Sequence, residues 1–288
     1  MLDLIIVGAG PAGLTAGIYA KQSGLSTLII GGRGVAGGLL NSTDKVNNFI
    51  GRPMVEGGEL ARSFVDHAAA EGVDIVHEDV LAISDTVSGF ELTTATNSYS
   101  ARTVIYTAGS EPRKLGVEGE ELEGVSYCAT CDGIFFSDEH VAVVGGGDAA
   151  VEEALYLAGI CKSVTMLVRS DFRAKQGLLE SLSALANVRV LKGVEVERVE
   201  GSDAVEAVEL SDGSKLLMAG VFVAVGQIPQ SAPAEPHAEL RPDGFIHASH
   251  TPGFYVAGDV ANPEYRQAII AAGEGAKAAL QVIAQLRF

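Results

Sequence analysis

The sequence has few cysteines, few basic residues and no long apolar run. Its 288 residues include three cysteines and no tryptophan, and 20 lysines and arginines against 37 acids give a net charge of −17. Such a charge disfavours a polyanionic partner and is most simply a solubility feature. No stretch approaches the roughly 18 uninterrupted apolar residues that indicate a membrane span. We therefore expect neither nucleic acid nor a membrane as a partner.

The scarcity of cysteine and histidine also limits the metal chemistry that the chain can perform. A structural zinc site needs about four ligands. The six histidines are scattered without ligand spacing, and the third cysteine, Cys161, has no second C-x-x-C beside it. We expect no metal site and interpret Cys161 as a small buried apolar residue. The first apolar run has no basic region before it, so an export signal is not expected, and the odd cysteine count favours a reducing cytoplasm.

The first glycine-rich segment is "LDLIIVGAGPAGLTAGIYAKQSGLSTLII", which predicts a strand, a glycine turn, a helix and a second strand. Gly8, Gly10 and Gly13 fit the pattern G-x-G-x-x-G. The first glycine permits the tight turn, the second lets a pyrophosphate approach the backbone, and the third lets helix and strand pack closely. The helix N-terminus then attracts the phosphate charge. This pattern predicts a dinucleotide site.

A second copy of the pattern occurs later, in "HVAVVGGGDAAVEEALYLAGICKSVTMLV". Here Gly145, Gly147 and Ala150 fit G-x-G-x-x-A. One such fingerprint is weak evidence, but two in strand–turn–helix context are much stronger. With 47% hydrophobic residues, the chain is long enough for two modest domains, each with its own core.

Alternating patterns predict a small β-meander after each fingerprint segment. The segments "TVIYTAGSEP" and "VFVAVGQIP" end alike and look like the two crossings between an outer domain and one inserted in it. The predicted organisation is an outer domain, residues 1–110 and 228–288, and an inserted domain, residues 111–227. The last part predicts a strand, a Gly-Asp turn and a long helix that completes the outer domain.

The stretch "SYCATCDG" places Cys128 and Cys131 two residues apart, directly before Asp132. Such a pair can bind a metal ion, form a structural disulfide or transfer electrons. A zinc site would need further ligands, which the sequence does not supply, and a structural disulfide is not expected in a cytoplasmic protein. A C-x-x-C pair can form a short disulfide loop and host a thiolate of low pKa, and disulfide exchange needs two distinct sulfurs. We therefore interpret the pair as redox-active.

The motifs together resemble those of one protein family. "GAGPAG", "VNNFIG", "YCATCDG", "GGGDAAVEEA", "PGFYVAGDV" and "YRQAIIAAGEG" stand in the order and approximate spacing of the low-molecular-weight thioredoxin reductases, almost from end to end. The resemblance implies an α/β fold of two Rossmann-like dinucleotide-binding domains, three-layered (β/β/α), the second inserted in the first. It also implies a homodimer that passes electrons from NADPH through FAD and a Cys128–Cys131 disulfide to thioredoxin.

The resemblance also implies roles for individual residues. Cys131 would accept electrons from reduced FAD, Cys128 would attack the thioredoxin disulfide, and Asp132 would be the acid–base group. Asn48 would reach toward the isoalloxazine. The residues expected to bind FAD are Gly8, Gly10, Pro11, Ala12, Gly13, Gly37, Gly38, Asn48, Gly258, Asp259, Arg266, Gln267 and Ala268. The residues expected to bind NADPH are Gly145, Gly147, Asp148, Ala149, Arg169 and Arg173.

Several positions depart from the family pattern. The family commonly has Gln, Glu and Pro where this sequence has Leu39, Asn47 and Ile50. These replacements could alter the redox potential of the flavin. They also resemble relatives of the family that take electrons from ferredoxin. After the second fingerprint, Val168 and Ser170 replace a His and an Arg of the NADPH-using relatives. The alternatives to an NADPH-dependent reductase are a ferredoxin-linked reductase, a dithiol oxidase that passes electrons to oxygen, and a flavin-binding redox sensor.

The second strand of the first fingerprint ends in "LIIGGRG", without the acidic residue that would be expected to bind a ribose there. The thioredoxin reductases share this lack, so the resemblance still implies FAD at the first fingerprint.

Overall fold

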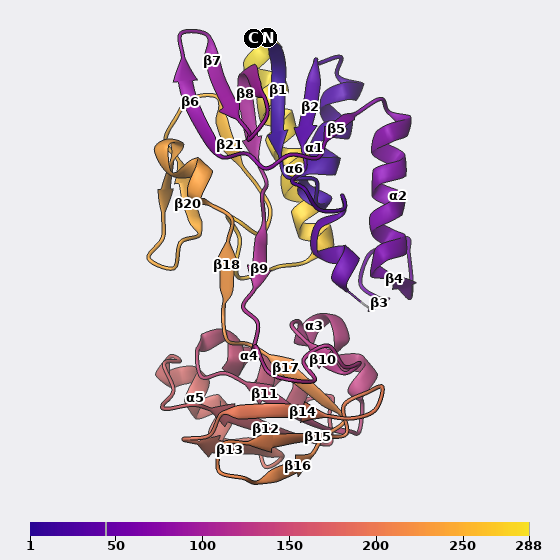
Figure 1. The fold of residues 1–288 in the computed structure, drawn as a ribbon, viewed down its shortest axis with the longest axis vertical. Helices are drawn as coiled ribbons and strands as arrows, with labels where there is room; N and C mark the ends of the chain where they lie inside the picture. Colours follow the sequence, from indigo (N-terminus) through magenta and orange to yellow (C-terminus); the bar gives the residue numbers. More distant parts are fainter. Residues whose placement is uncertain (44, 288) are drawn as a thin grey trace. The chain divides into compact units, whose positions relative to one another are not determined.

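The computed structural model describes residues 1–43 and 45–287. The chain divides into two compact units, one of Met1–Glu111 with Ile228–Phe288 and one of Pro112–Gln227 (Figure 1). Each unit has its own sheets and its own hydrophobic cores.

The first unit is built on a mixed sheet. Its parallel part contains β5 (Asp74–Val76), β2 (Thr27–Ile30), β1 (Leu2–Val7), β8 (Ser98–Tyr106) and β21 (Phe254–Val256). The antiparallel part continues from β8 through β7 (Gly89–Thr93) to β6 (Ala82–Thr86). The β-meander predicted after the first fingerprint is confirmed in β6–β7–β8.

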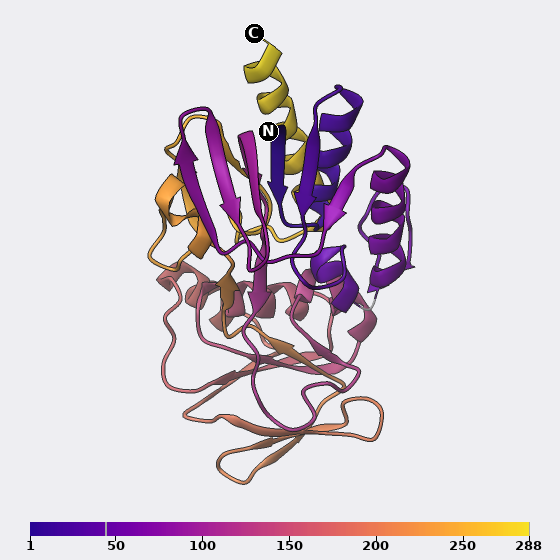
Figure 2. The ribbon, with the colours of Figure 1, turned by 45° about the horizontal axis from the view of Figure 1, so that its top comes forward.

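The continuous apolar run of β1 reflects a strand that is covered on both faces. Leu4 and Ile6 pack on one face with α1 (Pro11–Gln22) and α6 (Ala268–Arg287), which lie on the same side of the sheet (Figure 1 and Figure 2). Ile5 and Val7 pack on the other face with the meander. The alternation of β1 thus fixes which face of the sheet carries the helices.

Shorter elements complete the first unit. They are η1 (Gly38–Ser42), β3 (Lys45–Val46), β4 (Val55–Glu56), α2 (Gly57–Ala70), η3 (Ala232–His237), β19 (Ala238–Leu240) and β20 (Ile246–Ser249). β3 pairs with β4 and β19 with β20, each as an antiparallel two-stranded sheet. The sequence patterns predict neither α2 nor the β19–β20 hairpin.

The second unit repeats the layered plan. Its parallel sheet has the order β10 (Val125–Ser126), β17 (Gly220–Val223), β11 (His140–Val144), β12 (Ser163–Val168) and β13 (Val188–Lys192). An antiparallel sheet of β14 (Val196–Glu200), β15 (Ala207–Leu210) and β16 (Lys215–Leu217) follows. The helical elements are α3 (Ala129–Asp132), η2 (Gly133–Phe136), α4 (Asp148–Ala158) and α5 (Gln176–Ser183).

The alternation along β11 again separates two cores. Val141 and Val143 pack with α4, whereas Ala142 and Val144 pack with the three-stranded sheet. A helix layer, a parallel sheet and an antiparallel sheet therefore stack in this unit. The predicted second meander and the predicted α/β fold class are confirmed.

The chain passes between the units along β9 (Ser110–Pro112) and β18 (Gln227–Pro229), which pair as a two-stranded sheet. A glycine with positive φ precedes each strand, Gly109 at +74° and Gly226 at +117°. These are the segments in which the sequence predicted the crossings. Within the described residues, no helix has both the length and the apolarity needed to cross a membrane.

Candidate active site

The first fingerprint turn joins β1 to α1 and has the close packing that its glycines predict. A Cβ on Gly13 would lie 1.9 Å from the carbonyl oxygen of Gly8, so any side chain there would separate helix from strand. At Gly10, in contrast, the nearest atom to such a Cβ is the Cα of Gly38, at 3.9 Å. The backbone at Gly10 is therefore open to a ligand, and Pro11 begins a helix whose first N–H groups have no partner within the helix.

The loop that carries Gly37 and Gly38 lies against this turn. The N–H of Gly37 donates to the carbonyl of Ala9 at 2.8 Å, and a Cβ on Gly38 would lie 3.1 Å from the Cα of Gly10. Gly37 has φ of +122°, which favours glycine. Two predicted FAD segments that are distant from each other in sequence by more than 20 residues thus meet at one edge of the sheet.

A third predicted FAD segment follows β21. Gly258 has φ of +77°, and a Cβ there would lie 3.0 Å from the Cβ of Ala12. The carboxylate of Glu274, on α6, accepts from the Gly258 N–H and from the Asn262 side chain, both at 2.7 Å. Glu274 therefore holds the turn that presents Asp259 beside the first fingerprint.

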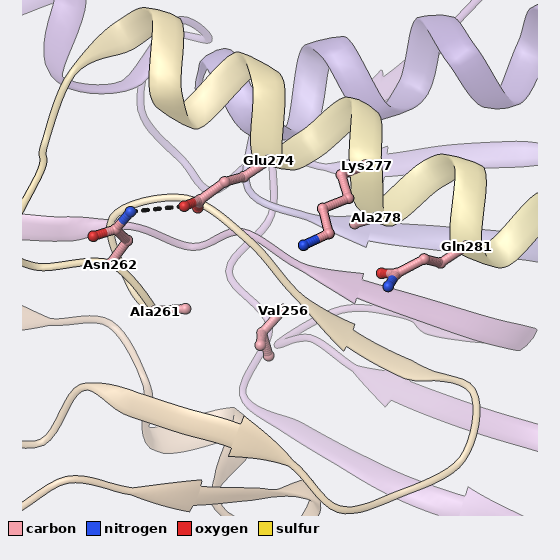
Figure 3. Close-up of a pocket in the computed structure, with 7 residues that line it drawn as sticks. All are labelled: Val256, Ala261, Asn262, Glu274, Lys277, Ala278 and Gln281. Atoms are coloured by element: carbon pink, nitrogen blue, oxygen red, sulfur yellow. Dashed lines mark hydrogen bonds between the residues drawn. The ribbon is translucent and has the colours of Figure 1, made fainter.

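A cavity of about 340 Å³ lies along α6 next to this turn (Figure 3). Its lining residues are Val256, Ala261, Asn262, Glu274, Lys277, Ala278 and Gln281. None of the predicted site residues lines it. Its link to the predicted FAD residues is Glu274, which lines the cavity and accepts from the Gly258 N–H and from the Asn262 side chain.

Asp259 is half-buried in this turn. The pKa of its carboxyl is raised to about 6, mainly by burial; the Arg266 guanidinium acts in the opposite direction, and the charge of Glu274 adds to the rise. Ionising a carboxyl group whose pKa is raised in this way lowers the stability of the fold. Such a residue is typical of a functional site rather than of a position optimised for stability. The predicted residues Asp259 and Arg266 therefore interact electrostatically in the structure.

We expect Asp259→Asn to make the flavin-free protein more stable at neutral pH. The folded-state pKa lies above the unfolded value, so the wild-type protein loses stability as pH rises from the unfolded pKa through about 6. The free energy of unfolding of the variant relative to wild type should increase by about 1 kcal/mol between about pH 5 and about pH 8. Urea titrations at both pH values test this, with exposed Asp66→Asn as the control. A constant difference would contradict it.

Two further predicted FAD residues are in direct contact. The side-chain amide of Asn48 donates to the Gln267 side chain at 2.8 Å, which joins the segment after β3 to the residue before α6. Ala268 is the first residue of α6. Among the departures from the family pattern, Asn47 is exposed, Ile50 is 85% exposed, and Leu39 is half-buried with its carbonyl accepting from two hydroxyls.

The second fingerprint turn, between β11 and α4, has the same packing. A Cβ on Gly145, where φ is +146°, would lie 2.4 Å from the Ala224 carbonyl oxygen and 2.8 Å from the Cβ of Ala150. Apart from the chain next to Gly147 itself, no atom of the described residues lies within 4 Å of such a Cβ there, so the backbone is open to a pyrophosphate. Asp148, the first residue of α4, accepts from the Lys175 N–H at 2.8 Å, which lowers the pKa of its carboxyl. Ala149 follows it in the first turn of the helix.

The two predicted phosphate-binding arginines lie on the loop after β12. Arg169 directly follows the last strand residue, and the N–H of Arg173 donates to the Gly146 carbonyl at 2.7 Å, which brings the loop against the fingerprint. Both side chains are exposed. Asp171, the acid between them, pairs with Lys192 at 2.7 Å. The loop can therefore present two cations beside a dinucleotide turn.

The two predicted redox cysteines form a disulfide with a Cα–Cα distance of 5.3 Å. Cys128 is the N-cap of α3, and its Sγ lies 3.4 Å from the Thr130 hydroxyl. The Ser126 hydroxyl donates to Asp132 Oδ2 at 2.5 Å, while the Cys128 N–H donates to the same hydroxyl at 3.1 Å. One serine thus couples the carboxylate to the backbone of the first cysteine, and this arrangement can carry thiol–disulfide exchange next to an acid.

The segment before the disulfide is held by a small polar cluster. Glu120 accepts from the Tyr127 hydroxyl and from the N–H groups of Leu115 and Gly116, the latter two at 2.7 and 2.9 Å. Lys114 lies over the Tyr127 ring at 4.4 Å. The cluster fixes the residue directly before Cys128.

The third cysteine is apart from this chemistry. Cys161 is 5% exposed, and burial raises the pKa of its thiol to about 11. Its interpretation as a small buried apolar residue is confirmed. In the described part of the chain, no group of three or more His, Cys, Asp or Glu side chains is arranged to hold a metal ion.

Comparison with known proteins first gives the class of protein. The family described as pyridine nucleotide-disulphide oxidoreductase matches residues 2–275, and the chain belongs to this family. A thioredoxin reductase of Mycolicibacterium smegmatis is 39% identical, over 96% of this chain and 94% of that protein. A bifunctional thioredoxin reductase/thioredoxin of Mycobacterium leprae is 36% identical, over 96% of this chain and 64% of that protein.

Solved structures agree with these matches. The crystal structure of a thioredoxin reductase from Streptococcus pyogenes superposes with a TM-score of 0.94 at 36% identity, covering 99% of this chain and 98% of that one. The resemblance to the thioredoxin reductases, first seen in the motifs, is therefore confirmed over nearly the whole chain.

Sequence patterns do not identify the residues that support the site rather than form it. Ser126, Glu274, Asn262 and Lys175 each hold a predicted site residue or its turn. Ser126 and Glu274 lie inside the sequence motifs, but the spacing of the motifs does not predict which residue each of them hydrogen-bonds. The partners come from other elements or from the turn geometry, so only the fold identifies them.

Proposed function

We propose that the chain is a thioredoxin-disulfide reductase that passes electrons from NADPH through FAD to the Cys128–Cys131 pair and from there to thioredoxin. The observation that carries this proposal is the disulfide on α3, with Asp132 linked to it through Ser126. It stands in a chain with two open glycine turns, one in each unit. The thioredoxin reductases that the chain resembles supply the substrate class.

The first unit fits FAD. Its glycine turn leaves the backbone at Gly10 open, and the Gly38 loop and the Asp259 turn lie against that turn. In the proposal, Gly8–Gly13 and Gly37–Gly38 hold the pyrophosphate, Asp259 the ribityl chain, and Asn48 with Arg266–Ala268 the flavin ring. FAD, when bound, supplies the two-electron relay between a nicotinamide and a disulfide.

The second unit fits a nicotinamide nucleotide. Gly145, Gly147 and the start of α4 at Asp148–Ala149 would cradle the pyrophosphate, with Arg169 and Arg173 on the 2′-phosphate. No acid stands at the end of β12 to accept from a free ribose 2′-hydroxyl, since β12 ends at Val168 and Arg169 follows. This favours NADPH over NADH.

The dithiol chemistry is assigned to the chain's own residues. The Cys128 thiolate attacks one sulfur of the thioredoxin disulfide, forms a mixed disulfide and displaces the other sulfur as a thiolate. Cys131 then attacks the Cys128 sulfur and displaces the second thioredoxin thiolate. Two electrons and two protons leave the dithiol, thioredoxin becomes a dithiol, and the Cys128–Cys131 disulfide returns. Asp132 holds the proton that a departing thiolate takes up.

The direct test is reduction of insulin disulfides by the purified protein with FAD, NADPH and thioredoxin. We expect NADPH consumption that depends on thioredoxin, with NADH a poorer donor. Omission of thioredoxin is the control. Formation of hydrogen peroxide at the same rate with and without thioredoxin would contradict the proposal and indicate the dithiol oxidase alternative.

Three finer features complete the proposal. A cytoplasmic location suits a dithiol that must be kept reduced. A homodimer is expected from the family and is tested by sedimentation velocity. Ferredoxin as an alternative donor follows from the departures at Leu39, Asn47 and Ile50. Anaerobic reduction of the bound flavin by NADPH, NADH and reduced ferredoxin, followed by stopped flow, compares the donors directly.

A further inference from the structure

The first dinucleotide turn lacks an acid at the end of its second strand. In such folds an Asp or Glu there accepts a hydrogen bond from the adenosine ribose. Here β2 ends at Ile30 and is followed by Gly31 and Gly32. Gly32 has φ of +77°, a conformation that costs an L-residue free energy, so the backbone at this position disfavours an acidic side chain.

The structure supplies a carboxylate at this place from the neighbouring strand. β5 pairs with β2 in parallel, so the residues after both strands meet at one edge of the sheet. The N–H of Gly32 donates to the Glu78 carbonyl at 3.1 Å, and Asp79 follows. Asp79 Oδ1 lies 3.6 Å from the position that a Cβ on residue 32 would take. Its carboxylate therefore occupies the region that the missing side chain would enter.

Asp79 also has the hydrogen-bonding capacity that a ribose needs. It accepts from the Arg33 N–H at 3.1 Å and pairs with the Arg33 Nε at 3.1 Å. An ionised carboxylate offers about four acceptor sites, so these contacts leave room for a hydroxyl donor. The Asp79 side chain is 51% exposed and accessible to a ligand.

The neighbouring Glu78 is not an equivalent candidate. Its carboxylate accepts from the hydroxyl of Thr94, from the Asn97 amide at 2.6 Å and from the Tyr99 hydroxyl at 3.2 Å. It is thereby turned toward the β7–β8 hairpin and occupied by that hairpin's own polar groups.

We propose that Asp79 accepts the hydrogen bond from the adenosine ribose 2′-hydroxyl of FAD, in place of an acid at the end of β2. This inference rests on the proposed binding of FAD by the first unit. It makes Asp79 a cofactor-binding residue that the fingerprint itself does not contain.

The test compares FAD with its analogue that lacks the adenosine 2′-hydroxyl. Each is titrated into the flavin-free protein, and Kd is measured by quenching of flavin fluorescence. The wild-type protein should bind the analogue about ten- to a hundredfold more weakly than FAD, as expected for a hydrogen bond to a charged group. Asp79→Ala and Asp79→Asn should weaken FAD binding by a similar factor, and Asp79→Ala should bind FAD and the analogue equally.

Two further variants separate this role from a structural one. Arg33→Ala removes the ion pair but keeps the carboxylate, and it should retain the discrimination between FAD and the analogue. Asp66→Asn, an exposed acid on α2, controls for net charge and should leave both Kd values unchanged. Equal discrimination in Asp79→Ala and wild type would overturn the inference, as would its loss in Arg33→Ala. Failure of the wild-type protein to bind FAD at all would instead refute the proposed function.

Discussion

Replacing either Cys128 or Cys131 by serine should lower the rate of thioredoxin reduction at least about a thousandfold, because the exchange needs both sulfurs and neither can act alone. The structure joins the two residues in one disulfide on α3. Their loss should nevertheless differ in character, since the proposal gives the two sulfurs different partners.

The Cys131→Ser variant retains Cys128, which should attack oxidised thioredoxin and stay linked to it, because the sulfur that would resolve the mixed disulfide is missing. The Cys128→Ser variant should form no such adduct. Non-reducing electrophoresis after incubation with thioredoxin measures the difference. Cys161→Ala is the matched control, as this cysteine is buried and takes no part in the disulfide. Adducts of equal yield in both variants would refute the assigned roles. An adduct in Cys128→Ser alone would reverse them.

The double variant Arg169→Ala, Arg173→Ala should raise KM for NADPH at least about a hundredfold while it changes KM for NADH less than about threefold. Both arginines are exposed on the loop after β12, and the Arg173 backbone is tied to the second fingerprint. Hydrogen bonds to a phosphate that does not react stabilise substrate and transition state alike, so kcat should change little.

Steady-state kinetics with both nucleotides test this prediction. Arg189→Ala, an exposed arginine on β13, is the control and should leave both KM values unchanged. An equal rise of KM for NADPH and NADH would indicate that the arginines contact a group that both nucleotides contain. No rise for either would leave the loop outside the donor site.

The sequence determined the local features of this protein, because they depend on residues that are close in the chain. The turn between β1 and α1 is predicted by Gly8, Gly10 and Gly13. The distances from a Cβ placed on each of these glycines to the nearest atoms agree with their separate roles. The continuous apolar run of β1 predicted a strand with two covered faces. The spacing of Cys128 and Cys131 predicted a short disulfide loop, which the structure contains.

Other features depend on contacts between distant segments, and only the tertiary structure decided them. Asn48 meets Gln267 across 219 residues, and Glu274 supports the Gly258 turn from α6. The pKa of Asp259 is raised by burial that no local pattern encodes. The sequence showed that β2 ends without an acid, but the pairing of β5 beside β2 brought Asp79 there. Parallel strands gather their carboxyl ends at one edge whatever their separation in the chain, and hydrogen-bond partners at that edge follow from strand order.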